Sequence, residues 1–188
     1  MPRRATAAPP HDVLAAMADA YVAFLKGFPW GVPLAESGAR EGLNKFIKNA
    51  YLGAFRGMKY RKAPLVTAAA LKRLRKKPVR RLVFEHVVPT TLIQVECEQL
   101  ARAGRLSKDH VLSWLRQYWV TATVTKEEDG HLSKVTMPAD WDRRDPFARY
   151  RLAGLILIPN PEAVGGLPGY PDLPVDWVRE RISVPMSR

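Results

Sequence analysis

The apolar positions in the first third of the chain follow the spacing of an α-helix. From residue 39 to residue 58 they recur at intervals of three or four, as on one face of a helix. These positions are Leu43, Phe46, Ile47, Ala50, Tyr51, Ala54, Phe55 and Met58. An earlier segment has the same spacing, at Leu14, Met17, Ala18, Tyr21 and Leu25. The pattern therefore predicts two amphipathic helices, over residues 12–26 and 39–58.

Capping residues bound three further helices in the middle of the chain. Thr67 and Pro78 enclose a helix predicted over residues 67–76, because threonine caps helix N-termini and proline ends helices. A helix over residues 91–102 has a glycine shortly after its end, and Ser107 begins the next one.

The segment "DPFARYRLAG" carries a complete set of helix boundaries. Asp145 is suited to the N-cap, Pro146 to the first helical position, and Gly154 to the end. We therefore predict a short helix between Asp145 and Gly154.

Runs of aliphatic and β-branched residues predict the strands. "VRRLVF" at 79–84 continues into Glu85 and His86, and "VTATVT" at 120–125 and "LILIP" at 155–159 are the other runs. Because helical segments outnumber these runs, we predict an α+β fold, a predominantly helical single domain with a small two- or three-stranded sheet.

Composition divides the chain into three parts. Residues 1–10 are rich in proline and alanine and are expected to form a disordered arm. Residues 11–158 are expected to form the single α+β domain. Residues 159–188 hold six of the sixteen prolines and are expected to form a Pro/Gly-rich C-terminal tail.

The positive charge of the chain is concentrated in one segment. The whole chain has a net charge of +12. Residues 40–81, called the basic block below, carry fourteen Lys/Arg against one acid, Glu41, a net charge of +13. Because such a block attracts a polyanion, nucleic acid is the leading partner, with DNA placed ahead of RNA.

The expected contact residues lie in the second half of the basic block. On a helix, Lys72, Arg75 and Lys76 share one face and can follow a phosphate backbone. The full set is Lys59, Arg61, Lys62, Lys72, Arg73, Arg75, Lys76, Lys77, Arg80 and Arg81. The sequence contains no helix-turn-helix, zinc-finger or RNA-recognition signature, so recognition of the backbone is expected rather than of bases.

The cysteine content and the hydropathy of the chain indicate in which cellular compartment the protein is expected. Cys97 is the one cysteine, so a disulfide within the chain is excluded, and its apolar neighbours favour a core position. No window is apolar for long enough to span a membrane, and no secretory signal pattern is present. We expect a cytoplasmic protein without a membrane partner.

The stretch "FEHVVP" resembles the first motif of HNH, or His-Me finger, nucleases. In that family an apolar strand ends in Asp/Glu-His, followed by two aliphatic residues and a proline. The resemblance implies a ββα unit around one divalent metal ion, Mg²⁺ or another. It also implies that His86 deprotonates the attacking water, with Glu85 as a metal-binding acid.

The same resemblance implies a second strand and helix that supply further metal ligands. "VTATVTKEEDGHL" fits this order, with Asp129 and His131 as the metal ligands and Glu128 in reserve. The loop asparagine that the family carries is absent, and residues 87–119 separate the two parts of the motif.

Structural readings of the same residues stay open. Glu85 and His86 lie on opposite faces of a strand, so Glu85 can pair with Arg80 or Arg81 while His86 bonds a backbone group. Strand alternation places Arg80 on the same side as His86. Thr125 and Glu128 match a capping box.

Three functions therefore follow from the sequence. The first is a nucleic-acid-binding protein that is also a metal-dependent endonuclease with His86 as general base. The second is a non-catalytic DNA- or RNA-binding or regulatory protein. The third is a basic inhibitor or adaptor that binds an acidic protein partner, with Trp141 and Trp177 as candidate anchors.

Overall fold

The computed structural model describes residues 10–28, 30–32, 36, 41, 45, 49, 58–76 and 78–163. The described helices are α1 (Pro10–Lys26), α3 (Lys59–Lys62), α4 (Ala68–Leu74), α5 (Thr90–Arg102), α6 (Lys108–Tyr118), α7 (Lys126–Asp129) and α8 (Ala148–Leu152). The strands are β1 (Leu65–Thr67), β2 (Leu82–His86), β3 (Thr121–Thr125) and β4 (Leu157–Pro159). None of these helices has the length and apolar content that crossing a membrane requires.

Several predicted segments lie outside the described residues. They are the arm up to residue 9, most of the helix predicted over residues 39–58, and the tail beyond residue 163.

The four strands form one mixed sheet in the order β2-β3-β1-β4. β1 runs parallel to β3, and the other two pairs are antiparallel. The predicted α+β class is confirmed. The sheet has four strands, whereas two or three were predicted. The additional strand is β1, which is too short, at three residues, to show an alternating pattern.

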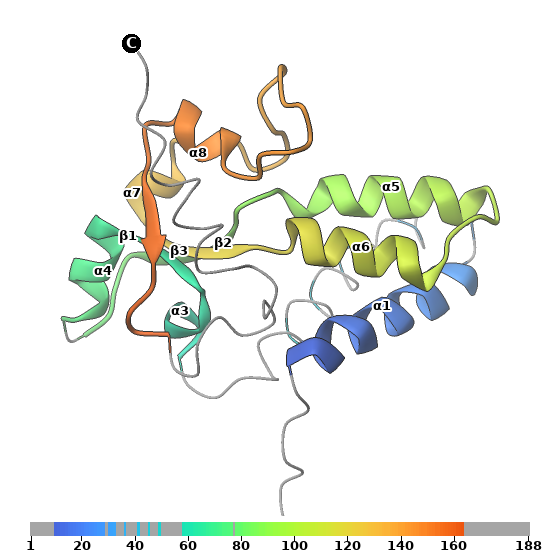
Figure 1. Cartoon of the computed structure of the whole chain (residues 1–188), viewed down its shortest axis with the longest axis horizontal. Coiled ribbons are helices and arrows are strands. Elements are labelled where there is room, and N and C mark those ends of the chain that lie inside the picture. The colour runs from blue at the N-terminus through green and yellow to red at the C-terminus, as the bar shows by residue number, and fades with distance from the viewer. Residues whose placement is uncertain are drawn as a thin grey trace, which may run out of the picture.

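A helical hairpin accounts for the long stretch between β2 and β3. β2 leads into α5, and α6 returns the chain to β3, while α1 packs along α6 (Figure 1). The three helices bury Met17, Tyr21, Cys97 and Leu115 between them. Burial raises the pKa of the Cys97 thiol to about 12, consistent with the core position expected for it.

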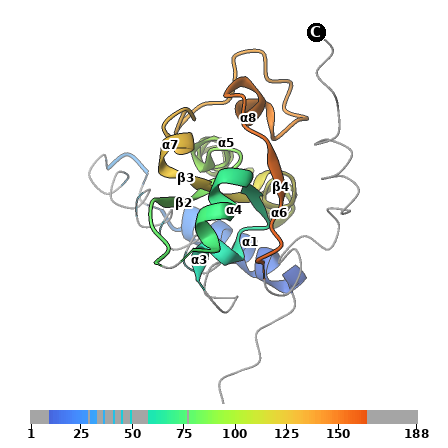
Figure 2. The same ribbon diagram turned by 90° about the vertical axis from the view of Figure 1, so that its left-hand side faces the viewer.

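Each face of the sheet is covered by different elements. One face carries Val66 and Leu82, which pack against buried side chains of α4; in Figure 2 this helix lies in front of the sheet. The other face carries Ala122 and Val124, which pack against the segment that contains α8 and its Tyr150. The alternation of β3 between these faces explains why all five of its side chains are buried.

The predicted helix boundaries are largely as found. Thr67 caps α4 by accepting a hydrogen bond from the Ala70 N–H, and Ser107 caps α6 in the same way. Asp145 was predicted as the N-cap of α8, but the helix begins later, with Phe147 as its N-cap. Asp145 instead accepts from the Phe147 N–H in the turn before the helix, and Gly154 has a φ of +67° just after it. Polar caps are local signals, which is why the sequence shows them.

The folded unit continues beyond the predicted boundary at residue 158. Asn160 is buried, and its side-chain amide donates to the Ala63 carbonyl at 2.8 Å. Glu162 pairs with two arginines of the basic block. The first residues of the predicted tail are therefore part of the domain.

Candidate nucleic-acid interface

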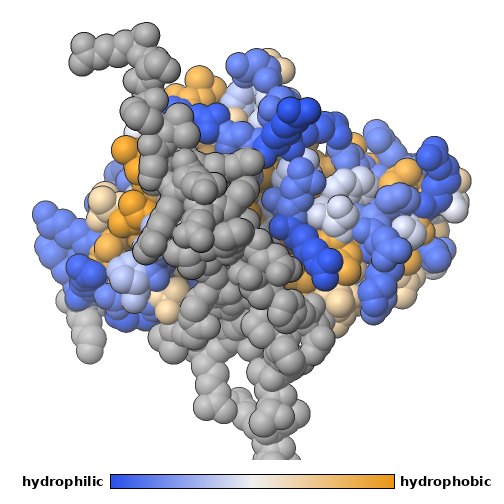
Figure 3. Space-filling model, viewed as in Figure 1, coloured by the Kyte–Doolittle hydropathy of each residue, from blue (hydrophilic) through white to orange (hydrophobic). Residues whose placement is uncertain are grey.

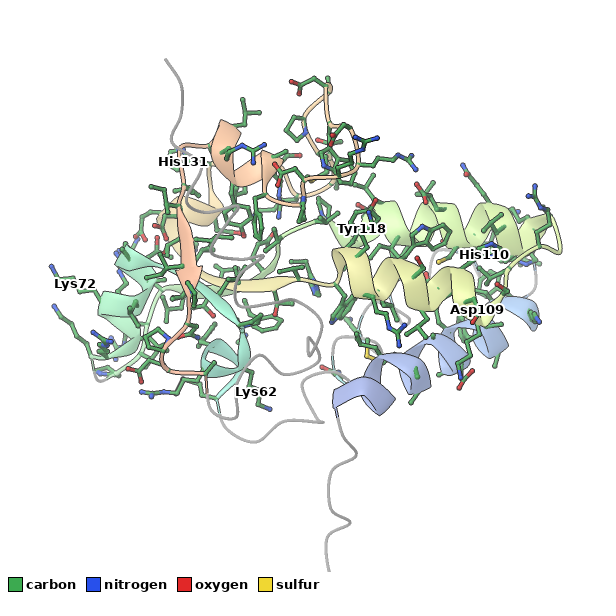
Figure 4. The ribbon with its side chains drawn as sticks, in the orientation of Figure 1. Lys62, Lys72, Asp109, His110, Tyr118 and His131 are labelled. Atoms are coloured by element: carbon green, nitrogen blue, oxygen red, sulfur yellow. The ribbon has the colours of Figure 1, made fainter. Side chains whose placement is uncertain are left out.

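α4 turns its apolar side chains to the sheet and its cations outward. Ala70 and Leu74 are fully buried. Lys72 is exposed on the opposite face, and Lys76 is exposed in the bend after the helix, which ends at Leu74 and not at residue 76 as predicted. The two residues are called the lysine ridge below. Figure 4 shows Lys72 pointing away from the sheet, and the edge over α4 is hydrophilic in Figure 3. Neither lysine makes an ion pair with another residue that the structure describes.

One pair of arginines flanks the ridge on the side of α7. Arg73 Nη1 lies 2.9 Å from Glu127 Oε2, and Arg81 Nη2 lies 3.0 Å from Glu127 Oε1. A hydrogen bond with its own backbone, together with the charges of the two arginines, lowers the pKa of Glu127. Glu127 is thus a carboxylate anion that bridges two guanidinium groups.

A second pair flanks the ridge on the opposite side. Arg61 Nη1 lies 2.5 Å from Glu162 Oε2, and Arg75 Nε lies 3.2 Å from Glu162 Oε1. Arg73 is in the last turn of α4 and Arg75 is its C-cap residue, with helical backbone angles, so the two side chains leave the helix in different directions. The result is a lysine ridge with one glutamate-bridged arginine pair on each side.

Arg81 holds an unusual backbone conformation at the entrance to β2. Its φ is +57°, a region that residues other than glycine rarely adopt. Its carbonyl accepts from the Lys126 N–H at 2.9 Å, which fixes the turn against α7. This turn makes β2 begin at Leu82, so the expected alternation from Arg80 to His86 is not present.

The remaining described cations of the predicted set lie on α3 and just before β2, and Figure 4 shows Lys62 apart from Lys72. Lys59 lies over the Tyr60 ring, 4.8 Å from its centroid, and Arg80 is exposed. Partial burial lowers the pKa of Lys62. Lys77 lies outside the described residues.

His86 lies at the far end of β2, among aromatic rings. Its ring centroid is 4.4 Å from that of Trp119 and 6.1 Å from that of Phe84, both in edge-on arrangements. The side chain is half-buried, and Trp119 and Phe84 beside it are buried. These contacts give His86 a packing role where the sheet meets the helical hairpin.

Glu85 points to the other face of the sheet and pairs with a buried arginine. Arg149 of α8 is 3% exposed, and its Nη2 lies 2.9 Å from Glu85 Oε1. The same guanidinium donates to the backbone carbonyls of His86 and Ser133. Glu85 therefore balances the charge of Arg149, and not that of Arg80 or Arg81, the partners expected for it.

The predicted metal ligands Asp129, His131 and Glu128 have different surroundings in the structure. Asp129 pairs with Lys134, and His131 is exposed. Glu128 Oε2 accepts from the Thr125 N–H at 2.8 Å and from the Thr67 hydroxyl at 2.7 Å. The capping box predicted at Thr125 is confirmed.

β2, antiparallel β3 and α7 follow one another in the order that the nuclease resemblance implies, with the helical hairpin inserted. The ends that carry the predicted site are nevertheless apart. His86 pairs with Thr121, while Leu82 pairs with Thr125, after which α7 begins. Four residues of strand, about 14 Å, therefore separate His86 from the start of α7. Among the residues that the structure describes, no group of three or more His, Cys, Asp or Glu is placed to hold a metal ion.

Of the two predicted aromatic anchors, the structure describes Trp141 alone. Trp141 packs edge-on against Tyr118, with ring centroids 5.6 Å apart, and its indole N–H donates to the Asp145 carbonyl. Trp177 lies outside the described residues.

No protein-family model, curated protein or solved structure matches the chain.

Sequence reasoning missed the two bridging glutamates and Arg149. Glu127 stands within "TKEE", where the capping signal of Glu128 dominates, and Glu162 stands in the proline-rich segment. Outside the basic block, acidic and basic residues nearly balance in number. This count shows that acids are present, but it does not show which of them fold against the basic block.

Proposed function

We propose that the protein binds nucleic acid through its phosphate backbone, with the lysine ridge of α4 at the centre of the contact. The observation that supports this most is the exposure of Lys72 on α4 and of Lys76 just after it, while the apolar side chains of the helix are turned toward the sheet. Exposed lysines that form no ion pair with a described residue favour a polyanion.

The charge balance of the surrounding face supports the same partner. The described cations of the predicted set are Lys59, Arg61, Lys62, Lys72, Arg73, Arg75, Lys76, Arg80 and Arg81. The acids that pair with them are Glu127 and Glu162. The excess of cations over acids in this set remains large after these ion pairs are formed, so this part of the molecule keeps a positive potential that attracts phosphates.

Recognition of the backbone fits the side chains on this face better than recognition of bases. Lysine acts on phosphate as a flexible point charge, whereas base reading needs side chains in fixed geometry at a groove. Four of the five arginines in the set are engaged by the two glutamates, and Arg80 is the exception. We therefore expect affinity with little dependence on sequence.

The test is the affinity of a labelled DNA duplex for the wild-type protein and for Lys72→Gln/Lys76→Gln, measured by fluorescence anisotropy. Loss of two phosphate contacts at 0.1 M salt is expected to weaken binding roughly 60-fold, from a slope of about 0.9 per contact. The control is Lys26→Gln/Lys108→Gln, an exposed lysine of α1 and one of α6, of which Lys108 pairs with Asp19.

The control variant is expected to bind within about twofold of the wild type, since its lysines lie on α1 and α6 rather than in the lysine ridge. Equal weakening in both variants would show that total charge alone matters, and the proposed face would then be wrong. Absence of any binding by the wild type to DNA or RNA would refute the proposed function itself.

A further inference from the structure

Each glutamate on the proposed interface occupies the kind of position that a phosphate group takes between arginines. Glu127 gives one carboxylate oxygen to Arg73 and the other to Arg81. Glu162 divides its two oxygens between Arg61 and Arg75 in the same way. Guanidinium groups bind carboxylates and phosphates with the same paired N–H donors, so the two anions compete for one site.

The two sites are related by their position on α4. Arg73, in the last turn of α4, and Arg75, its C-cap residue, extend to different sides of the lysine ridge, so one site borders each side of the C-terminal end of α4. An α-helix with its side chains is about 10–12 Å across. The major groove of B-DNA is about 12 Å wide and has a phosphate backbone along each edge.

We propose that Glu127 and Glu162 are resident anions in two phosphate subsites, and that the two backbones of a DNA duplex displace them. This inference depends on the proposed function, because it assigns the arginine pairs to the same contact as the lysine ridge. The substrate class it names is double-stranded DNA, since a single strand offers only one backbone to the two flanks.

The surroundings of the glutamates allow their displacement. The side chains of Glu127 and Glu162 are 45% and 22% exposed, and the arginines they bridge are 35–68% exposed. Ion pairs at such a surface contribute little to stability. The glutamates come from α7 and from the segment after β4, so rotation of their side chains leaves the position of α4 unchanged.

The experiment compares duplex binding by the wild type, Glu127→Gln, Glu162→Gln and the double variant. Each substitution removes a competing anion and keeps the shape of the side chain. Each is expected to raise duplex affinity about eightfold at 0.1 M salt and to steepen the log–log salt slope by about 0.9. The matched control is Glu96→Gln, which breaks a comparable pair with Arg143, 2.5 Å apart, on α5.

The outcomes separate this inference from the function on which it depends. If the wild type binds duplex DNA but the glutamine variants bind equally or more weakly, the glutamates only position the arginines and the inference is overturned. Equal gains for a single strand, or a gain only for duplex RNA, would overturn the assignment to the two DNA backbones. A gain of the same size for Glu96→Gln would show that the affinity depends only on the net charge of the protein, and it would also overturn the inference. Failure of every variant to bind any nucleic acid would instead refute the proposed function.

Discussion

Single residues in this protein take roles that depend on partners far along the chain. Glu85 pairs with Arg149, which follows it by sixty-four positions and is buried. The sequence shows that Glu85 and His86 end a strand and point in opposite directions, and the structure agrees. It could not show which cation meets Glu85, because Arg80 and Arg81 are nearer in sequence and Arg149 stands in an ordinary helix pattern.

Removing the buried arginine is expected to destabilise the fold. Arg149→Met leaves the Glu85 carboxylate without its cation and removes the donor to two backbone carbonyls. We expect a loss of about 3 kcal/mol in the free energy of unfolding, measured by urea titration. Glu85→Gln, which keeps those carbonyl bonds and an amide oxygen for Arg149, is expected to cost less. A larger loss for Glu85→Gln than for Arg149→Met would contradict the roles assigned to the two side chains.

The nuclease prediction depends on His86 acting as a base. Because His86 packs against Trp119 and lies a strand length from the start of α7, we expect no cleavage that depends on it. Supercoiled plasmid and RNA are incubated with the wild type and His86→Ala, in Mg²⁺ or Mn²⁺ and in EDTA. Equal results for the two proteins are expected. Metal-dependent cleavage by the wild type that His86→Ala loses would contradict this expectation and support the nuclease prediction.

At the scale of elements, the sequence predicts helix caps but does not predict which strands pair in the sheet. Thr67, Ser107 and Thr125 each cap the helix that the sequence assigns to them, because a cap acts within one turn. β1 was missed because three residues carry no periodicity, and its strand identity comes from lying between β3 and β4. The turn at Arg81 was missed as well, since neither glycine nor asparagine marks its left-handed backbone.

Thr67 joins the start of α4 to the cap of α7, so its loss should affect both elements. Its hydroxyl accepts from the Ala70 N–H at 3.2 Å and donates to Glu128 Oε2 at 2.7 Å. Thr67→Ala is expected to lower the free energy of unfolding by about 1–2 kcal/mol, and Thr67→Ser, which keeps the hydroxyl, by less. Thermal or urea unfolding of the two variants provides the comparison. Equal losses would mean that the methyl group, rather than the hydroxyl, matters here.

At the scale of the whole molecule, the excess of positive charge was located correctly by counting residues. The structure adds the arrangement: two exposed lysines at the C-terminal end of α4 and just after it, two arginine pairs beside them, and one glutamate that bridges each pair. The glutamates could not be assigned from sequence because they follow the basic block by many residues. The proposed function requires that the lysine ridge contacts phosphate groups directly.

The salt dependence of duplex binding tests this requirement most directly. With about five phosphate contacts, the logarithm of the binding constant is expected to fall against the logarithm of salt concentration with a slope of roughly −4 to −5. The Lys72→Gln/Lys76→Gln variant is expected to show a slope shallower by about 2, and the Lys26→Gln/Lys108→Gln control an unchanged one. Binding that does not depend on salt concentration, or a slope that is the same in the Lys72→Gln/Lys76→Gln variant as in the wild type, would contradict the proposed contact with phosphates.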